Sequence, residues 1–241
     1  MTCNACCATY ARVFGKNVAR FEAWRYRHFG PARATRTLLA LIQAAHSAKD
    51  AEVLDIGAGI GAAHLELLKA GARCATDVDA SSAYLEAARA EAERLGLGSR
   101  VTYHYADFTR VADAIAPADI VVLDRTICCY PDMPALLGAA ARTARHVLGL
   151  VWPRETWWVR AAVRAFNMFE RLTSSCPLMV YVHPVAAVDA VADQHGLRCC
   201  ASRDVGFWHV RVYARGSAQR QHAEVVEGDV HAGSVEKRDR H

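Results

Sequence analysis

The stretch Val53-Leu54-Asp55-Ile56-Gly57-Ala58-Gly59-Ile60-Gly61 decides the fold of this chain. Its apolar first part predicts a buried strand over 52–56, and the closely spaced glycines predict a tight turn into a helix that runs through Leu68. Glycines in such a turn let the backbone bend sharply, so that main-chain N–H groups can face a ligand. The stretch therefore predicts a ligand-binding loop at the end of the first strand of an α/β sheet.

Strands and helices alternate after this loop. We expect strands over 72–78, 101–106, 119–123 and 146–151, with helices over 83–95 and 133–145 between them. Repeated strand–helix–strand units form a parallel sheet with helices on both faces. Further on, we expect a helix from Pro153 to about Leu172, an extended piece over 179–182, a helix over 184–195, and a hairpin of strands 198–205 and 207–213. The antiparallel hairpin makes the sheet mixed.

Two helices are expected before the first strand. Apolar residues at helical spacing predict one from about Ala8 to Arg27, and Gly30-Pro31 separates it from another that ends near His46. This segment is basic, which suits an acidic ligand, although arginines on a helix more often form a solvated face. We expect residues 1–48 to cap the acceptor side of a domain that spans 1–215. The polar residues 216–241 are expected to be a disordered tail.

The composition is that of an ordinary globular protein, with 53% hydrophobic and 22% charged residues and a net charge of +4. The nine cysteines include adjacent pairs, which do not suggest a disulfide framework. No signal peptide and no membrane-spanning run is apparent, so we expect a cytoplasmic protein. The basic residues lack an appended recognition module, and no Asn-Pro-Pro-Tyr-like segment follows the fourth strand, which argues against a nucleic-acid substrate. The oligomeric state is not indicated.

A carboxylate stands near the end of each of the first three strands: Asp55 before the glycine loop, Asp79 in Asp77-Val78-Asp79-Ala80-Ser81, and Asp107 in Ala106-Asp107-Phe108. Asp55 would repel a pyrophosphate but favour a ligand with an ammonium and a sulfonium, or it can cap the N–H groups of the loop itself. Asp79 is placed to accept hydrogen bonds from two ribose hydroxyls. Asp107 is placed to accept one from an adenine amino group, with Phe108 over the ring.

Together these motifs resemble the motif series of class I S-adenosylmethionine (SAM)-dependent methyltransferases, over about 51–151. The resemblance implies a Rossmann-like, doubly wound, seven-stranded sheet in the order 3-2-1-4-5-7-6, with SAM as co-substrate across the strand ends. It implies that the methionine part of SAM lies against Asp55, Gly57, Gly59 and Gly61. It also implies that Asp79 binds the ribose and that Asp107 and Phe108 lie at the adenine.

The acceptor side is predicted from the segment Leu123–Asp132. In this family the segment runs beneath the methyl group, so the resemblance implies that Asp124 and Arg125 contact SAM or the acceptor. Its Cys-Tyr-Pro pattern is similar to that of magnesium-protoporphyrin O-methyltransferases, which implies a small acidic and apolar acceptor. A carboxylate acceptor needs no general base. For a hydroxyl acceptor, the candidate bases are Asp124, Tyr130 and His183.

Other hypotheses stay open. The glycine loop also fits a dinucleotide fingerprint, which would make the chain an NAD-dependent oxidoreductase. The cysteines Cys3, Cys6 and Cys7, with Cys128, Cys129 or Cys176, would suit a metal- or metalloid-binding protein, or a thiol or metalloid methyltransferase. A closed zinc site normally shows two ligand pairs and only one is present, so no metal ligand is assigned.

The helix after Pro153 carries Trp157, Trp158 and spaced arginines. These side chains can roof a flat acidic acceptor or make a peripheral contact with a membrane surface. Alternatively, Trp158 and Phe166 only pack on the sheet, because aromatic residues most often belong to a core.

Overall fold

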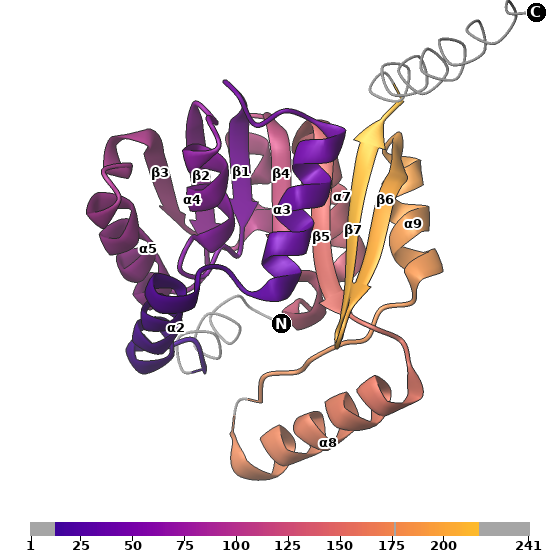
Figure 1. The fold of residues 1–241 in the computed structure, drawn as a ribbon. Helices are drawn as coiled ribbons and strands as arrows, with labels where there is room; N and C mark the ends of the chain where they lie inside the picture. The colour runs from indigo at the N-terminus through magenta and orange to yellow at the C-terminus, as the bar shows by residue number, and fades with distance from the viewer. Residues whose placement is uncertain (1–12, 176, 217–241) are drawn as a thin grey trace, which may run out of the picture.

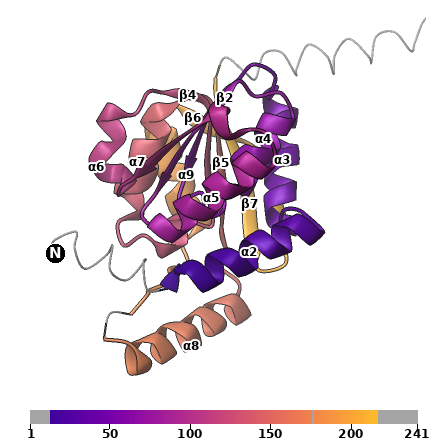
Figure 2. The same ribbon diagram turned by 90° about the vertical axis from the view of Figure 1, so that its left-hand side faces the viewer.

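The computed structural model describes residues 13–175 and 177–216, which form one seven-stranded sheet with helices on both faces (Figures 1 and 2). The strand order is β3-β2-β1-β4-β5-β7-β6. Strand β7 is antiparallel to β5 and β6, and the remaining pairs are parallel. The strands are β1 (Glu52–Ile56), β2 (Cys74–Asp79), β3 (Val101–Tyr105), β4 (Ala118–Asp124), β5 (Ala144–Pro153), β6 (Leu197–Val205) and β7 (Trp208–Arg215). The predicted fold class and strand order are confirmed.

The helices form two layers and a group at one end of the sheet. They are α2 (Lys16–Phe29), α3 (Arg33–Ala45), α4 (Ala62–Lys69), α5 (Ser82–Arg94), α6 (Phe108–Val111), α7 (Met133–Thr143), α8 (Trp157–Thr173) and α9 (Val185–Gln194). Helices α3, α4 and α5 cover one face of the sheet, and α6, α7 and α9 cover the other (Figure 2). Helices α2 and α8 lie at the end where the parallel strands finish (Figure 1).

Local sequence explains most of these elements. Ile120 to Leu123 of β4 are completely buried, as expected for a central parallel strand covered on both faces. Ser81 caps α5 by accepting a hydrogen bond from the N–H of Tyr84 at 3.2 Å. Asp132 caps α7 in the same way, with the N–H of Ala135 at 3.0 Å. Helices α5 and α7 therefore begin where a short polar side chain satisfies a free N–H group.

Two predicted boundaries were wrong. Helix α2 begins at Lys16 because Gly15 is extended and takes the N-cap position, so the described part of the predicted helix is interrupted there. Pro153 ends β5 and does not open α8, because a proline cannot donate a ladder hydrogen bond. The piece predicted to be extended over 179–182 has no regular secondary structure, and the N–H and C=O groups of Val180 are bound by the side-chain amide of Asn167 on α8.

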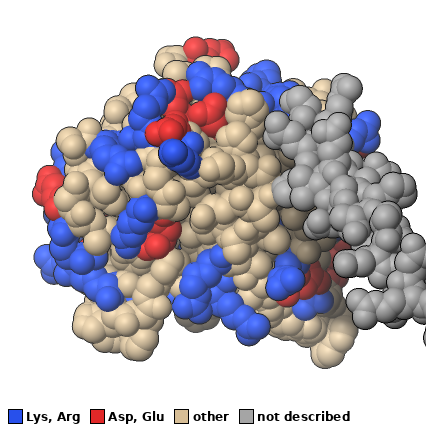
Figure 3. Space-filling model, turned by 45° about the horizontal axis from the view of Figure 1, so that its top comes forward, with Lys and Arg blue, Asp and Glu red and all other residues tan. Residues whose placement is uncertain are grey.

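On the face seen in Figure 3, basic side chains are spread among acidic and uncharged ones. In the fold as a whole, basic residues also form ion pairs, such as those of Arg145 on β5 with Glu52 and Asp119. On this face the basic side chains therefore do not gather into a single patch. Within the described ranges, no helix is long and apolar enough to cross a bilayer. Residues 217–241, predicted to be a tail, lie outside the described residues.

Helix α3 packs across β5 and β7, and a glycine allows this close approach. A Cβ at Gly149 of β5 would lie 2.6 Å from Cδ1 of Ile42 and 3.0 Å from Cδ1 of Leu38. Both helix residues are completely buried. The position of α3 thus depends on the missing side chain at residue 149.

We expect Gly149→Val to lower the free energy of unfolding by about 1–3 kcal/mol, because the added methyl groups overpack the contact with α3. Urea denaturation of the variant and the parent measures this difference. Thr102→Val places the same valine side chain at an exposed position of β3 and serves as the control. Equal unfolding midpoints for Gly149→Val and the parent would show that α3 can move away freely.

Candidate active site

A cavity of about 440 Å³ lies at the carboxyl ends of the parallel strands. Its floor is the glycine loop after β1, and its sides are the ends of β2, β3 and β4. Helices α2 and α3 contribute Glu22, Arg25, Tyr26 and Thr35 to its wall. Open α/β sheets bind ligands at this edge, next to the point where the strand order reverses. The three carboxylate-bearing strand ends therefore meet around one cavity.

The glycine loop is built so that only glycine fits. Gly57, Gly59 and Gly61 have φ values of 65°, 59° and 79°, in the left-handed region. A Cβ on Gly57 would lie 2.5 Å from Cγ2 of Thr126, and one on Gly61 would lie 2.5 Å from Cε1 of His64. Gly57 and Gly59 therefore present backbone to the cavity, whereas Gly61 is not among its lining residues.

Asp55 lies buried at the end of β1 and holds the first turn of α4. Its Oδ2 accepts hydrogen bonds from the N–H of His64 at 3.2 Å and from Nδ1 of His64 at 3.0 Å. Its Oδ1 is buried and has no hydrogen-bond partner among the described residues. This arrangement corresponds to the alternative in which Asp55 supports the loop region, and it leaves Oδ1 as the oxygen available to a ligand.

Asp79 binds the loop directly from the end of β2. Its Oδ2 accepts from the N–H of Gly59 at 3.0 Å, and its Oδ1 accepts from the N–H of Ser81 at 2.7 Å. Burial raises the pKa of this carboxyl to about 6, although both hydrogen bonds lower it. A carboxylate has about four acceptor positions, so Asp79 keeps acceptor capacity for a ligand hydroxyl. The site therefore fits a ribose at this point.

Asp107 and Tyr130 form one network at the far side of the cavity. The hydroxyl of Tyr130 donates to Asp107, lying 3.1 Å from both carboxylate oxygens, and it is 2.7 Å from Oγ1 of Thr109. Asp107 also caps α6 by accepting from the N–H of Thr109 at 3.1 Å. Phe108 lines the cavity and is 4% exposed. The structure thus joins Tyr130 to the predicted adenine-binding carboxylate.

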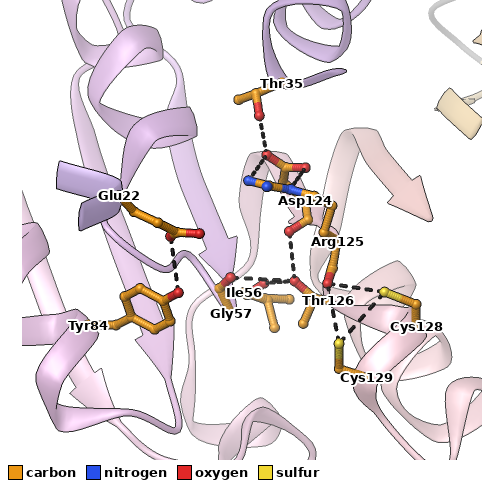
Figure 4. A network of polar contacts seen from close by, with 10 residues as sticks. All are labelled: Glu22, Thr35, Ile56, Gly57, Tyr84, Asp124, Arg125, Thr126, Cys128 and Cys129. Carbon is orange, nitrogen blue, oxygen red and sulfur yellow. Dashed lines mark hydrogen bonds and ion pairs between the residues drawn. The ribbon is translucent and has the colours of Figure 1, made fainter. Parts of the chain in front are cut away.

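Asp124 and Arg125 lie together at the end of β4 (Figure 4). Oδ2 of Asp124 accepts from the hydroxyl of Thr35 at 2.5 Å, and Oδ1 accepts from Nε of Arg125 at 3.1 Å. The Asp124 charge raises the pKa of Arg125, so the guanidinium stays protonated. Arg125 has a φ of 62°, which is uncommon for a residue with a side chain and is typical of functional sites. This pair connects the strand end to α3.

Glu22 approaches the loop from the opposite side (Figure 4). Its Oε2 accepts from the hydroxyl of Tyr84 at 3.0 Å and would lie 3.9 Å from a Cβ on Gly59. Burial and the Glu22 charge raise the pKa of Tyr84, which keeps its hydroxyl protonated as a donor. The sequence signal for Glu22 is its isolation, because it is the only acid between Met1 and Ala48. Neither Glu22 nor Thr35 was assigned a site role from sequence.

The basic residues of α2 divide between structure and site. Arg27 pairs with Glu91 on α5, whose side chain is completely buried, and Lys16 lies 3.5 Å from Glu86 on the same helix. Arg25 instead lines the cavity and is half-buried. The interpretation as a solvated face therefore does not describe Arg25 or Arg27.

Cys128 and Cys129 line the cavity as reduced thiols, with their sulfur atoms 3.8 Å apart. The hydrogen bond between them, together with burial, raises the pKa of Cys128, and the same bond lowers that of Cys129. Among the described residues, no group of three or more His, Cys, Asp or Glu side chains could hold a metal ion. Cys3, Cys6, Cys7 and Cys176 lie outside the described residues.

His183 is not brought to the cavity. Its Nε2 bonds the carbonyl of Ile127 at 3.0 Å, and it is not among the lining residues. Burial lowers its pKa, which favours the neutral ring. Of the three candidate bases, only Asp124 and Tyr130 face the ligand space.

Comparison with known proteins agrees with this geometry. Residues 53–147 match the family model described as a methyltransferase domain. The structure is similar to that of magnesium protoporphyrin IX methyltransferase from Synechocystis PCC 6803 with bound SAH, with a TM-score of 0.65 and 19% identity over 87% of this chain and 100% of that one. It is also similar to an O-methyltransferase family protein from Burkholderia thailandensis, with a TM-score of 0.61 and 18% identity over 76% and 56% of the two chains. No curated protein matches the sequence.

The strand order, the cavity at the carboxyl edge and the family match define an enzyme of the SAM-dependent methyltransferase class. SAM is its co-substrate, and the matched region favours methyl transfer over the NAD-dependent alternative.

We expect the affinity for SAM to rise with pH up to about pH 6 and then to level off. Asp79 has a pKa of about 6, and below that pH the protonated group loses acceptor capacity for the ribose hydroxyls. Isothermal titration calorimetry across this range measures the profile. In Asp79→Asn, affinity should fall at least tenfold above pH 6 and this step should disappear. Asp113→Asn, on an exposed turn, is the control; unchanged affinity in Asp79→Asn would contradict the ribose assignment.

Proposed function

We propose that this enzyme transfers the methyl group of SAM to a carboxylate of an apolar, porphyrin-like small molecule. The observation that carries the proposal is the composition of the cavity wall beyond the SAM-binding edge. That wall is aromatic and aliphatic, and two arginines, Arg25 and Arg125, face the same space. Its apolar members are Phe14, Tyr26, Phe166, Leu178, Val180 and Trp208. An apolar acid suits such a surface, because its body is desolvated while its carboxylate pairs with a guanidinium.

The structural similarity supports the acceptor class. The Synechocystis protein is by its title a magnesium protoporphyrin IX methyltransferase, and the present chain spans its whole length. The Cys129-Tyr130-Pro131 segment, from which this resemblance was predicted, lies at the cavity through Cys129 and Tyr130. The proposal therefore puts the acceptor between the end of β4 and helices α2, α3 and α8.

For SAM, the proposal assigns the ribose to Asp79 and the adenine to Asp107 and Phe108. The methionine part lies along Gly57, Gly59 and Gly61, near the unpartnered Oδ1 of Asp55. Glu22 adds a second carboxylate near the loop, and it suits the methionine ammonium because a cation gains from nearby acids. These roles rest on the hydrogen-bonding capacity and the positions described above.

The chemistry needs little from the protein beyond placement. A carboxylate oxygen of the acceptor attacks the methyl carbon in line, forming the O–C bond as the C–S bond breaks. The electron pair of that bond stays on sulfur, which leaves as a neutral thioether. No proton moves, so neither Asp124 nor Tyr130 has to act as a base. Arg25 and Arg125 orient the carboxylate, and α2 and α3 exclude water.

The acceptor class is tested with radiolabelled SAM and a set of porphyrins. We expect labelled methyl ester from protoporphyrin IX or its magnesium complex, and none from the dimethyl ester, in which both carboxylates are already blocked. Label transferred equally to the dimethyl ester would contradict an O-methylated carboxylate. Absence of transfer to every free acid would exclude this acceptor class while leaving SAM binding intact.

Arg25 provides a test of carboxylate binding. We expect Arg25→Gln to raise the KM for the acceptor about tenfold or more, because a charge-assisted hydrogen bond is lost, with the Kd for SAM unchanged. Steady-state kinetics with varied acceptor and calorimetry with SAM give the two values. Arg20→Gln, on an exposed position of the same helix, is the matched control. A changed SAM affinity with an unchanged acceptor KM would show that Arg25 binds SAM and not the acceptor.

The cytoplasmic location belongs to the same proposal, as does the absence of a nucleic-acid substrate. The cavity suits a small-molecule acceptor, because it is apolar and lies between helices, where a small molecule can be enclosed.

A further inference from the structure

Helix α8 has an outer face that the fold does not use. Exposed apolar residues cover it: Trp157 is 81% exposed, Leu172 79%, Met168 62% and Phe169 61%. Trp158 is 41% exposed, and Ala161 and Ala165 lie exposed between these larger side chains. An apolar surface of this size on a globular protein usually marks an interaction site. We refer to these residues as the α8 outer face.

The opposite side of α8 already holds the helix in place. Val159 and Val163 are buried against the rest of the protein. Asn167 bonds both main-chain groups of Val180, and Glu170 accepts from the N–H of Leu178 at 3.0 Å. The inner side of α8 therefore holds the helix in place by itself. The exposed residues of the outer face are not needed for packing within the described fold.

A stripe of arginines runs along one flank of this face. Arg160, Arg164 and Arg171 are exposed, and their spacing of four and seven residues puts them on one side of the helix. Arg160 lies 3.5 Å from Glu155 at the start of the helix. Glu170, the acid within α8 itself, points to the anchored side. The charge beside the outer face is therefore positive.

We propose that the α8 outer face docks the enzyme on an anionic lipid membrane. A helix with Trp, Phe and Leu on one face and arginines beside them lies in the plane of a bilayer surface, with its apolar residues among the acyl chains. The arginines then meet the negative headgroups. A second copy of the chain is a poorer occupant, because two copies packed through this face bring two like-charged stripes together. The inference does not depend on the acceptor proposed above.

The position of α8 gives this surface a consequence for the reaction. Helix α8 lies beyond the carboxyl end of the sheet, at the same end as α2 (Figures 1 and 2). Phe166 of α8 lines the cavity, as do Leu178 and Val180 of the segment that it anchors. Helix α2 adds exposed Phe21, Trp24 and Phe29 at this end. A docked enzyme therefore has its cavity wall close to the lipid.

The test is cosedimentation of the full-length protein with phosphatidylcholine vesicles, with and without phosphatidylserine. We expect binding that is stronger with phosphatidylserine and that weakens with salt. Phe169→Glu combined with Leu172→Glu should reduce binding at least tenfold. Arg164→Gln combined with Arg171→Gln should reduce only the phosphatidylserine-dependent part, by roughly fivefold per arginine. Tyr105→Glu changes a residue that is 59% exposed on β3, far from α8 in sequence, and serves as the control.

Circular dichroism and SAM binding confirm that each variant is folded. If the protein binds neither kind of vesicle, the proposal is wrong. It is also wrong if Tyr105→Glu reduces vesicle binding as much as the α8 variants do. Light scattering of the protein without lipid provides an independent outcome. If the parent is a dimer that Phe169→Glu with Leu172→Glu converts to monomers, the α8 outer face is a contact between copies, and the membrane proposal is wrong.

Discussion

The site depends on a backbone constraint: the chain must turn between β1 and α4 in a space that admits no side chain. Gly57 would clash with Thr126 and Gly61 with His64 if either carried a Cβ. Because the loop lies this close to its surroundings, its N–H groups are fixed by neighbours, such as that of Gly57 by the carbonyl of Val78 at 2.8 Å. The loop can then present backbone to SAM without rearranging.

The same closeness explains why carboxylates accumulate where burial disfavours them. Asp55 and Asp77 are completely buried and lie opposite each other in the register of β1 and β2. Burial and the nearby carboxylates Asp55 and Asp79 raise the pKa of Asp77 well above its usual value. Keeping these acids buried lowers stability at neutral pH, since the raised pKa values of Asp77 and Asp79 favour their protonated forms. Such clusters mark functional sites, and here the ligand itself is a cation.

Much of the fold and about half of the site were predictable from sequence, and the division has a physical cause. Strand β4 and the caps at Ser81 and Asp132 follow from short-range patterns, so the order of elements was right. The first residues of α2 and α8 were not predicted correctly, because Gly15 and Pro153 are each compatible with two local structures, and tertiary packing decides between them. Those positions carry no further local signal.

In the site, residues on the glycine loop and strand ends were predicted because their spacing along the chain fixes their place. Thr35 and Glu22 were not, because they reach the cavity through the docking of α2 and α3, which sequence spacing does not specify. His183 shows the converse error. Its type suggested a base, but its ring bonds the carbonyl of Ile127 and it does not line the cavity.

The two ends of the cavity bind their ligands through different interactions. The strand ends use hydrogen bonds, and the side next to α8 uses apolar contact. At the strand ends, SAM has to be held by hydrogen bonds whose geometry the sheet fixes, and there Asp55 and Asp79 are buried. At the acceptor side, the flat apolar molecule that we propose as acceptor would gain its affinity from desolvation, which requires aromatic surface and not a fixed hydrogen-bond pattern. Such a molecule is poorly soluble in water and accumulates in lipid. Helix α8 faces the cavity through Phe166 and solvent through Trp157 and Leu172. It therefore lies between the lipid and the cavity, the two environments that such an acceptor would cross.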